Sequence, residues 1–340
     1  MCRFILALVA AEMLIACAGG LCAAESAPPA AVVPPVPVGA VERLDPRLDR
    51  LVPADAALEK LAEGFIWSEG PVWMPAGHLL FSDIPRNSVM KWAPRGGLSL
   101  ALKPAGYTGA DPRGGESGSN GLLLDRQGRL VLCQHGDRRI ARLEKDGSFT
   151  TLADRYEGKR LNSPNDAVYR SNGDLYFTDP PYGLAQGPND PARELDFCGV
   201  YRLSAAGELT LLTRDLSRPN GIGFSPDEKR LYVAVSDPAK AAWMVYDVQP
   251  DGRIAGGRVH YDATPHVKTH KGLPDGLKVD RAGNLFATGP GGVNVLTPDG
   301  TLLGRINPGV ATANCAFGGD GYLYLTAHTM LCRIQLAPPP

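Results

Sequence analysis

The chain has 340 residues, which is long enough for one large domain or two domains of ordinary size. Hydrophobic residues make up 44% and charged residues 21%, as in an ordinary globular protein. The net charge of −1 gives no reason to expect a nucleic-acid or membrane-surface partner. The 40 glycines and 30 prolines suit many short strands joined by tight turns better than helices.

Residues 1–25 are predicted to be an export signal, which would place the protein in the periplasm. Arg3 supplies the positive start, and an apolar stretch interrupted by Glu12 leads into small residues. Two processing sites compete: a small-residue cleavage site around Cys22, and a lipoprotein box in which Cys17 would carry a lipid anchor. The apolar stretch is too short and too broken to favour a membrane span.

After the signal, the chain is predicted to divide into a linker over residues 26–50, one domain over residues 51–336 and a tail at 337–340. The first part of the linker is rich in Pro, Ala and Val, which is typical of an extended tether. Four cysteines lie beyond the signal: Cys133, Cys198, Cys315 and Cys332. Their even number permits disulfides in an oxidising compartment, and buried free thiols are the alternative.

Within the domain one pattern recurs six times: an acidic or amide residue, a small or short residue, and then an apolar start. The six segments are 68–71, 119–122, 164–167, 219–222, 273–277 and 313–316. Each is followed by a short apolar strand that a glycine usually precedes, as at residues 128–132. An alternating strand, a Gly-containing hairpin turn and a fourth strand complete the unit, as at residues 139–152.

This repeat, with a period of about 40 to 55 residues, predicts an all-β, six-bladed β-propeller with four antiparallel strands in each blade. The last unit ends at residues 331–336, which is only its third strand. We expect residues 57–64, at the start of the domain, to supply the missing strand and close the ring. A single propeller without extra helical segments gives no sign of an oligomer, so we expect a monomer.

The polar residues of the six segments should meet at one mouth of the central channel, because each occupies the same position at the start of an innermost strand. They are Glu69, Asn120, Asn165, Asn220, Asp275 and Asn314. Two carboxylates with several amide oxygens favour a hard divalent cation, calcium before magnesium. The alternative is that Asn-Gly and Asp-Gly are merely turn residues. Glu69 argues against that alternative, since Glu is a poor turn residue.

The loops after the second strands should return to the same mouth. They carry Asp179, His135 and His328, which we expect at the edge of the pocket, although surface or packing roles for the histidines are equally open. The spacing of the histidines does not support a zinc site.

Five segments together resemble the gluconolactonase/regucalcin (senescence marker protein) family, and its bacterial gluconolactonase branch most. They are 69–73, 162–166, 176–183, 218–221 and 274–277. The resemblance implies a six-bladed propeller that hydrolyses sugar lactones with a divalent metal, commonly Ca²⁺, with Zn²⁺, Mg²⁺ and Mn²⁺ as alternatives. It also implies that Glu69, Asn220 and Asp275 are metal ligands, that Asn165 is a further ligand or a substrate contact, and that Asp275 is the general base.

The resulting hypothesis is a metal-dependent lactonase, in which the cation polarises the lactone carbonyl and water attacks it. Asp275 or His135 would take the proton of that water, unless the cation activates the water directly. Asn120, Asn165, Asp179 and His328 are the predicted contacts of a small-molecule lactone. Two alternatives stay open: an organophosphate or other ester hydrolase on the same ring, and a non-catalytic exported propeller stabilised by its metal.

Overall fold

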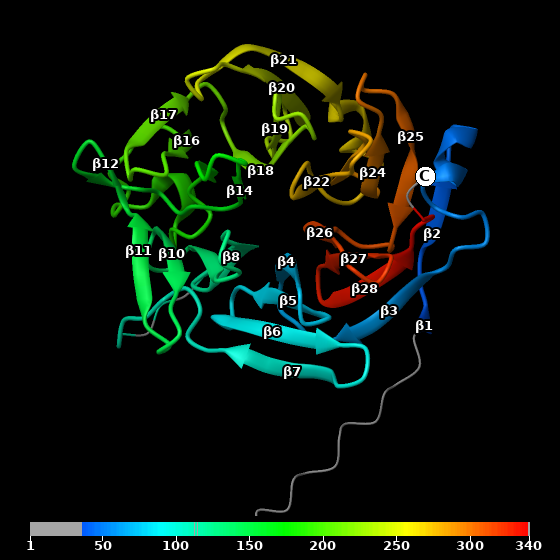
Figure 1. The fold of residues 1–340 in the computed structure, drawn as a ribbon, viewed down its shortest axis with the longest axis horizontal. Coiled ribbons are helices and arrows are strands. Elements are labelled where there is room, and N and C mark those ends of the chain that lie inside the picture. Colours follow the sequence, from blue (N-terminus) through cyan, green and yellow to red (C-terminus); the bar gives the residue numbers. More distant parts are fainter. Residues whose placement is uncertain (1–35, 112, 114, 339–340) are drawn as a thin grey trace, which may run out of the picture. The chain divides into compact units, whose positions relative to one another are not determined.

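The computed structural model describes residues 36–338 except 112 and 114, and the predicted export signal with Cys17 therefore lies outside the described residues. Six antiparallel sheets stand in a ring around a central axis, as the repeat predicts (Figure 1). Among the described residues, no helix has the length and hydrophobicity needed to cross a bilayer.

The first four blades follow one another along the chain, each with its innermost strand first. Their strands are β4 Ser68–Met74, β5 His78–Asp83, β6 Ser88–Ala93, β7 Gly97–Leu102; β8 Ser119–Leu124, β9 Leu130–Gln134, β10 Arg139–Leu143, β11 Phe149–Ala153; β14 Ala167–Tyr169, β15 Leu175–Asp179, β16 Gly199–Leu203, β17 Leu209–Thr213; β18 Pro219–Phe224, β19 Arg230–Val235, β20 Ala242–Val248, β21 Ile254–Asp262.

The last two blades gain strands from the N-terminal part of the chain, one in the fifth blade and two in the sixth. Their strands are β22 Leu277–Val279, β23 Leu285–Gly289, β24 Gly292–Leu296, β25 Leu302–Asn307 with β2 Ala40–Arg43; and β26 Asn314–Phe317, β27 Tyr322–Ala327, β28 Met330–Gln335 with β3 Leu58–Glu63 and β1 Val36–Pro37. The remaining elements are the hairpin β12 Arg155–Tyr156 and β13 Lys159–Arg160, and the 3-10 helices η1 Pro46–Arg50, η2 Gly187–Asn189 and η3 Thr264–His266.

The ring closes through the pairing of β3 with β28, which confirms the expected closure by residues 57–64. The pairing register sets Glu59 opposite Arg333, and the two side chains form an ion pair of 2.9 Å across it. An N-terminal strand thus occupies the outer edge that the last blade would otherwise leave open.

The folded part begins earlier than the sequence predicts, since residues 36–50 do not form a free linker. The strand β2 pairs with β25, and Leu48 of η1 is fully buried in a hydrophobic cluster together with Val52. Proline and small residues are compatible with short edge strands, so the composition of this segment did not reveal its burial.

The hydrophobic core lies between neighbouring blades. Side chains that alternate along the strands form one cluster after another around the ring; Val131, Phe177 and Tyr201, for example, join the second and third blades. The four cysteines of the domain are buried in this packing as free thiols. This dry packing fixes the blades at constant spacing, so the starts of the innermost strands are brought together at the channel.

Candidate functional site

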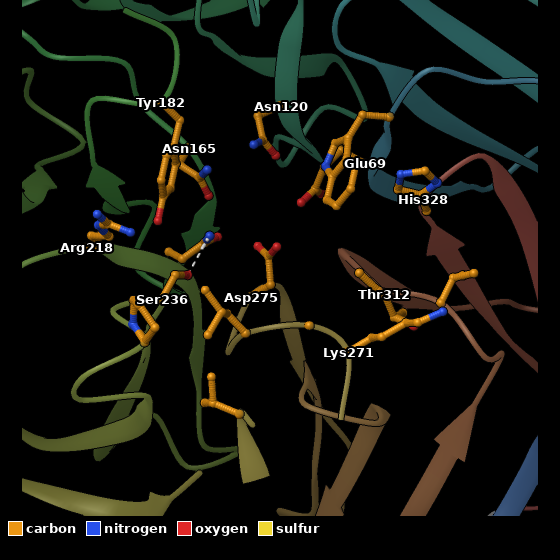
Figure 2. A pocket seen from close by; sticks show the side chains of 18 of the residues that line it. Glu69, Asn120, Asn165, Tyr182, Arg218, Ser236, Lys271, Asp275, Thr312 and His328 are labelled. Carbon is orange, nitrogen blue, oxygen red and sulfur yellow. Dashed lines mark hydrogen bonds between the residues drawn. The ribbon is translucent and has the colours of Figure 1, made fainter. Parts of the chain in front are cut away.

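Five of the six repeated polar residues line one cavity of about 770 Å³ at the mouth of the channel (Figure 2). They are Glu69, Asn120, Asn165, Asn220 and Asp275. Each comes from the start of a different innermost strand, because the repeat places them at one phase of successive blades. The predicted convergence at one mouth is therefore present for five of the six residues.

The glycine that follows four of the six polar residues allows close approach between blades. A Cβ atom on Gly221 would lie 2.3 Å from the carbonyl oxygen of Asp275, and one on Gly276 would lie 1.9 Å from Cγ of Asn314. Neither glycine has a positive φ angle, so neither is there for a tight turn. The turn interpretation of these Asn-Gly and Asp-Gly pairs is wrong, because glycine here lets adjacent blades meet at the channel axis.

Hydroxyl side chains on the second strands hold the neighbouring blade's polar segment in place. The hydroxyl of Thr178 donates to the carbonyl oxygen of Asn220 at 2.7 Å, and that of Ser82 to the carbonyl oxygen of Asn120 at 2.9 Å. Thr288 repeats this contact with Ala313 at 2.8 Å. These bonds fix the backbone of the cavity wall before any ligand binds.

Three of the oxygen atoms in the cavity wall lack partners. The Oδ1 atoms of Asn120, Asn165 and Asp275 are buried, and within the described part of the chain none of them accepts a hydrogen bond. The side-chain amide of Asn220 donates to Ser236 at 3.0 Å, which leaves its own oxygen as the free acceptor. Buried oxygens without donors are costly, so this arrangement is typical of a site completed by a cation or a hydrogen-bonding ligand.

The raised pKa values of the Glu69 and Asp275 carboxyl groups also favour a bound cation. Burial raises the pKa of Glu69, and the negative charge of Asp166 adds to that rise. Burial also raises the pKa of Asp275 well above its ordinary range, and repulsion from Glu69 adds to it. Two carboxylates that repel each other in a low-dielectric cavity are both stabilised as anions by a divalent cation.

The donor set fits a hard cation rather than a thiophilic one. Carboxylate and amide oxygens converge in the cavity, which suits Ca²⁺ or a similar oxygen-seeking ion. Over residues 36–111, 113 and 115–338, no three His, Cys, Asp or Glu side chains are grouped so that they could hold a metal by themselves. The amide oxygens of Asn165 and Asn220 are therefore needed to complete a ligand set with Glu69 and Asp275.

The rest of the cavity wall contains residues that the sequence analysis did not select. They include Glu116, Tyr182, Arg218, Ser236, Lys271 and Thr312. A signal was available for three of them, since Glu116, Arg218 and Lys271 each lie two to four residues before a repeated polar residue. The predicted substrate contact His328 also lines the cavity, where it is exposed and packs edge-on against Trp67 with ring centroids 5.2 Å apart.

Two predicted site residues lie behind the wall. Asp179 is fully buried, and its carboxylate accepts the backbone N–H groups of Asn162 and Ser163 at 2.8 Å each. It therefore holds the segment before Asn165, and the prediction that it contacts substrate is wrong for this geometry. His135 is also fully buried and does not line the cavity. Its expected position matched that of His328, but the segment 115–118 covers it.

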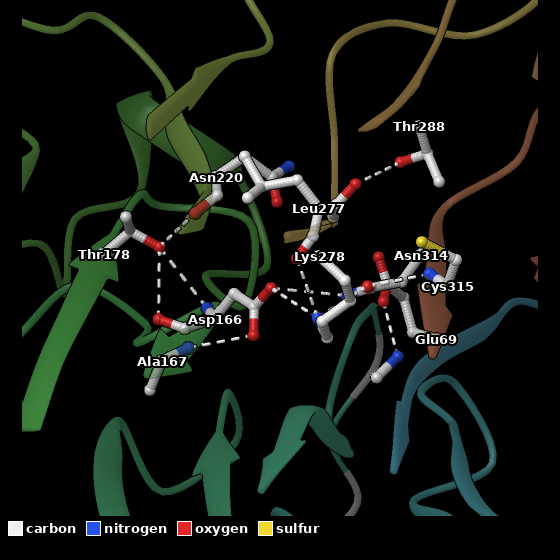
Figure 3. A network of polar contacts seen from close by, with 12 residues as sticks. Glu69, Asp166, Ala167, Thr178, Asn220, Leu277, Lys278, Thr288, Asn314 and Cys315 are labelled. Carbon is white, nitrogen blue, oxygen red and sulfur yellow. Dashed lines mark hydrogen bonds and ion pairs between the residues drawn. The ribbon is translucent and has the colours of Figure 1, made fainter. Parts of the chain in front are cut away.

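The sixth repeated residue, Asn314, turns away from the cavity into a second polar layer within the channel (Figure 3). Its amide oxygen accepts from the ammonium group of Lys278 at 3.2 Å, and its amide nitrogen lies 3.4 Å from Oδ2 of Asp166. Lys278 Nζ also lies 3.9 Å from that carboxylate. We call Asp166, Lys278 and Asn314 the channel layer, and the five cavity-lining residues the cavity layer.

Comparison with known proteins matches this architecture. The family described as SMP-30/Gluconolactonase/LRE-like region matches residues 67–329. A gluconolactonase from Zymomonas mobilis is 39% identical over 307 residues, 88% of this chain and 86% of that protein. A pentonolactonase from Haloferax volcanii is 30% identical over 76% of this chain and 80% of its own length. The solved structure of a gluconolactonase from Xanthomonas campestris superposes with a TM-score of 0.78 at 34% identity, covering 90% of this chain and 98% of that one.

Proposed function

The chain belongs to the SMP-30/gluconolactonase/LRE-like family, and from this premise we propose that it hydrolyses a sugar lactone to the aldonic acid with the help of a divalent cation. The observation that carries the proposal is the set of three buried, unpartnered oxygens, those of Asn120, Asn165 and Asp275, which three different blades bring to one cavity. A related gluconolactonase that spans most of the chain identifies the lactone as the substrate class.

Glu69, Asn165, Asn220 and Asp275 would hold the cation, and we propose that it is Ca²⁺, because all the donors are oxygens from carboxylates and amides. When bound, such an ion polarises a carbonyl group and stabilises negative charge on its oxygen. Ser236, which also lines the cavity, accepts a hydrogen bond from the side-chain amide of Asn220 and thereby fixes the orientation of that ligand.

Other side chains of the cavity would orient the sugar. Asn120 offers an unpartnered buried oxygen to a substrate hydroxyl. Burial raises the pKa of Tyr182, so its phenol stays neutral and can donate a hydrogen bond. Arg218 and Lys271 line the cavity from opposite sides (Figure 2), and their positive charges favour a substrate in which ring opening creates a carboxylate. Trp67 provides an apolar surface beside these groups.

We also propose that the protein is exported to the periplasm, on the strength of the signal pattern in residues 1–25. Cleavage near Cys22 and acylation of Cys17 would give products of different mass. Mass spectrometry of the protein purified from its native host distinguishes them, and an intact N-terminus would refute export through this signal.

The function is tested by measuring the hydrolysis of D-glucono-δ-lactone through proton release, after chelation and again after calcium is returned. The lactone opens spontaneously, so each rate needs a matched blank without enzyme. We expect turnover well above the blank only with calcium, together with a calcium-dependent rise in the melting temperature. A melting temperature that rises while no lactone is hydrolysed would instead favour a binding protein, and faster hydrolysis of an organophosphate would favour that ester class.

A further inference from the structure

Glu116 is a third carboxylate on the wall of the cavity, outside the proposed set of metal ligands. It lies on the segment that enters β8, four residues before Asn120, and its side chain is 37% exposed. It therefore faces the space where a lactone would lie, with one side open to the cavity.

The backbone around Glu116 is held firmly by neighbouring blades. The N–H of Gly118 donates to the carbonyl of Ile84 at 2.8 Å, and the N–H of His135 donates to the carbonyl of Gly118 at 3.0 Å. A Cβ atom on Gly136 would lie 2.4 Å from the carbonyl oxygen of Ser117, so the segment packs tightly onto the end of β9. These contacts position the carboxylate without help from a ligand.

Behind Glu116 stands the imidazole of His135, which has no exposed surface. Its Nδ1 atom lies 3.1 Å from Oε2 of Glu116, a close contact that is not aligned as a hydrogen bond. No other described residue forms a hydrogen bond with either ring nitrogen. Gly183 packs closely against the base of this side chain, since a Cβ atom there would lie 2.5 Å from Cβ of His135. The imidazole therefore reaches the cavity only through Glu116.

We propose that Glu116 is the general base of the reaction and that His135 is the positioning residue that orients its carboxylate. The assignment rests on the proposed lactonase function. Asp275 is less suited to this role, because a carboxylate that holds a metal ion loses basicity. Glu116 shares the cavity with Asp275 but contributes to no ligand set, so its oxygen stays available to a water molecule.

The proton balance of the reaction can be followed through Glu116. As a water oxygen bonds to the lactone carbonyl carbon, one of its protons passes to the Glu116 carboxylate. When the bond between that carbon and the ring oxygen breaks, the same proton passes to the ring oxygen, which becomes a hydroxyl group. The acid product then releases its proton to solvent, and Glu116 returns to its starting state. His135 keeps one carboxylate oxygen directed at the cavity throughout.

The test is the isosteric variant Glu116→Gln, assayed with D-glucono-δ-lactone at saturating calcium. We expect kcat to fall by about 10² to 10⁴-fold, while KM and calcium affinity, measured by isothermal titration calorimetry, change by less than about threefold. Glu116→Ala should be partly rescued by formate, which can enter the vacated space as an external base. His135→Gln should lower kcat by about tenfold with KM unchanged. Glu63→Gln, on the exposed outer edge at β3, is the matched control and should keep wild-type kinetics.

Three results would overturn the assignment. A wild-type kcat in Glu116→Gln would show that Glu116 is not the general base, while the lactonase function would stand. The absence of formate rescue in a folded Glu116→Ala protein would have the same meaning. Loss of calcium affinity with kcat restored by excess calcium would make Glu116 a metal ligand instead. Failure of the lactonase function itself would look different, since the wild-type protein would then be inactive on lactones, and the assignment would fall with it.

Discussion

The cavity layer and the channel layer are built from the same repeated segments, but they satisfy their polar groups in different ways. In the cavity layer, the oxygens of Asn120, Asn165 and Asp275 have no partners among the described residues. In the channel layer, Lys278 and Asn314 bind each other and lie beside Asp166. The protein itself completes the second layer, whereas the first requires a ligand.

The difference teaches how one repeat can serve both stability and chemistry. The ammonium of Lys278 offsets one of the three buried carboxylates near the axis, which are Glu69, Asp166 and Asp275. Two negative charges remain, and they match the charge of one divalent cation. A single lysine in place of a repeated apolar residue thus separates a structural layer from a functional one.

The variant Asp275→Asn breaks the cavity layer and should have the largest effect. The amide keeps the shape of the carboxylate but removes half of the charge that would bind the cation. We expect kcat/KM on D-glucono-δ-lactone to fall by at least about 10³-fold, equivalent to about 4 kcal/mol. Asp166→Asn, the matching change in the channel layer, should cost about tenfold or less. Near-normal turnover in calcium-saturated Asp275→Asn would remove that residue from the mechanism.

The variant Lys278→Met breaks the channel layer and should affect stability more than catalysis. It leaves the Asp166 carboxylate buried without its counter-charge, which should lower the free energy of unfolding by about 1–3 kcal/mol in a urea titration. Lys229→Met is a matched control, because its ion pair with Asp227 spans the same 3.9 Å but is largely exposed. That control should cost less than about 0.5 kcal/mol. Equal losses in the two variants would show that burial of the pair does not matter.

The variant His328→Asn tests an exposed residue of the cavity wall and should have the smallest effect on catalysis. His328 is exposed, so water competes for any contact that it makes with substrate. Asparagine tolerates the φ of 55° at this position, which avoids strain in the variant. We expect KM for the lactone to rise by about threefold with kcat unchanged, in steady-state assays. An unchanged KM would remove His328 from the substrate contacts.

The sequence predicts the fold and most of the cavity layer, because both follow from a periodic pattern. The repeat predicts the blades, and the missing last strand predicts the closure of the ring. The shared position at the start of each innermost strand predicts the five cavity residues. Periodicity does not give the direction of a side chain, which is why Asn314 belongs to the channel layer although it stands at the same phase as Asn120. That direction depends on Lys278 and Asp166, which only the folded ring brings together.

Loops account for the rest of the differences. Asp179 ends the second strand β15 and His135 directly follows β9, yet both side chains are fully buried. Glu116 and Arg218 reach the cavity from the segments that lead into β8 and β18, and their spacing from the repeated polar residue differs between the two blades. The burial of residues 40–50 does not follow from their composition, because it comes from the long-range pairing of β2 with β25 and from the packing of Leu48.

The pairing of β3 with β28 also affects how the chain completes its folding. Glu59 and Arg333, which meet across this pair, lie 274 positions apart in the sequence. During synthesis β3 leaves the ribosome long before β28 exists, so its edge remains unpaired for most of that time. The ring cannot lock until the last strand has been made. Until then the sixth blade lacks the strand that joins it to the N-terminal segment, and the ring stays open.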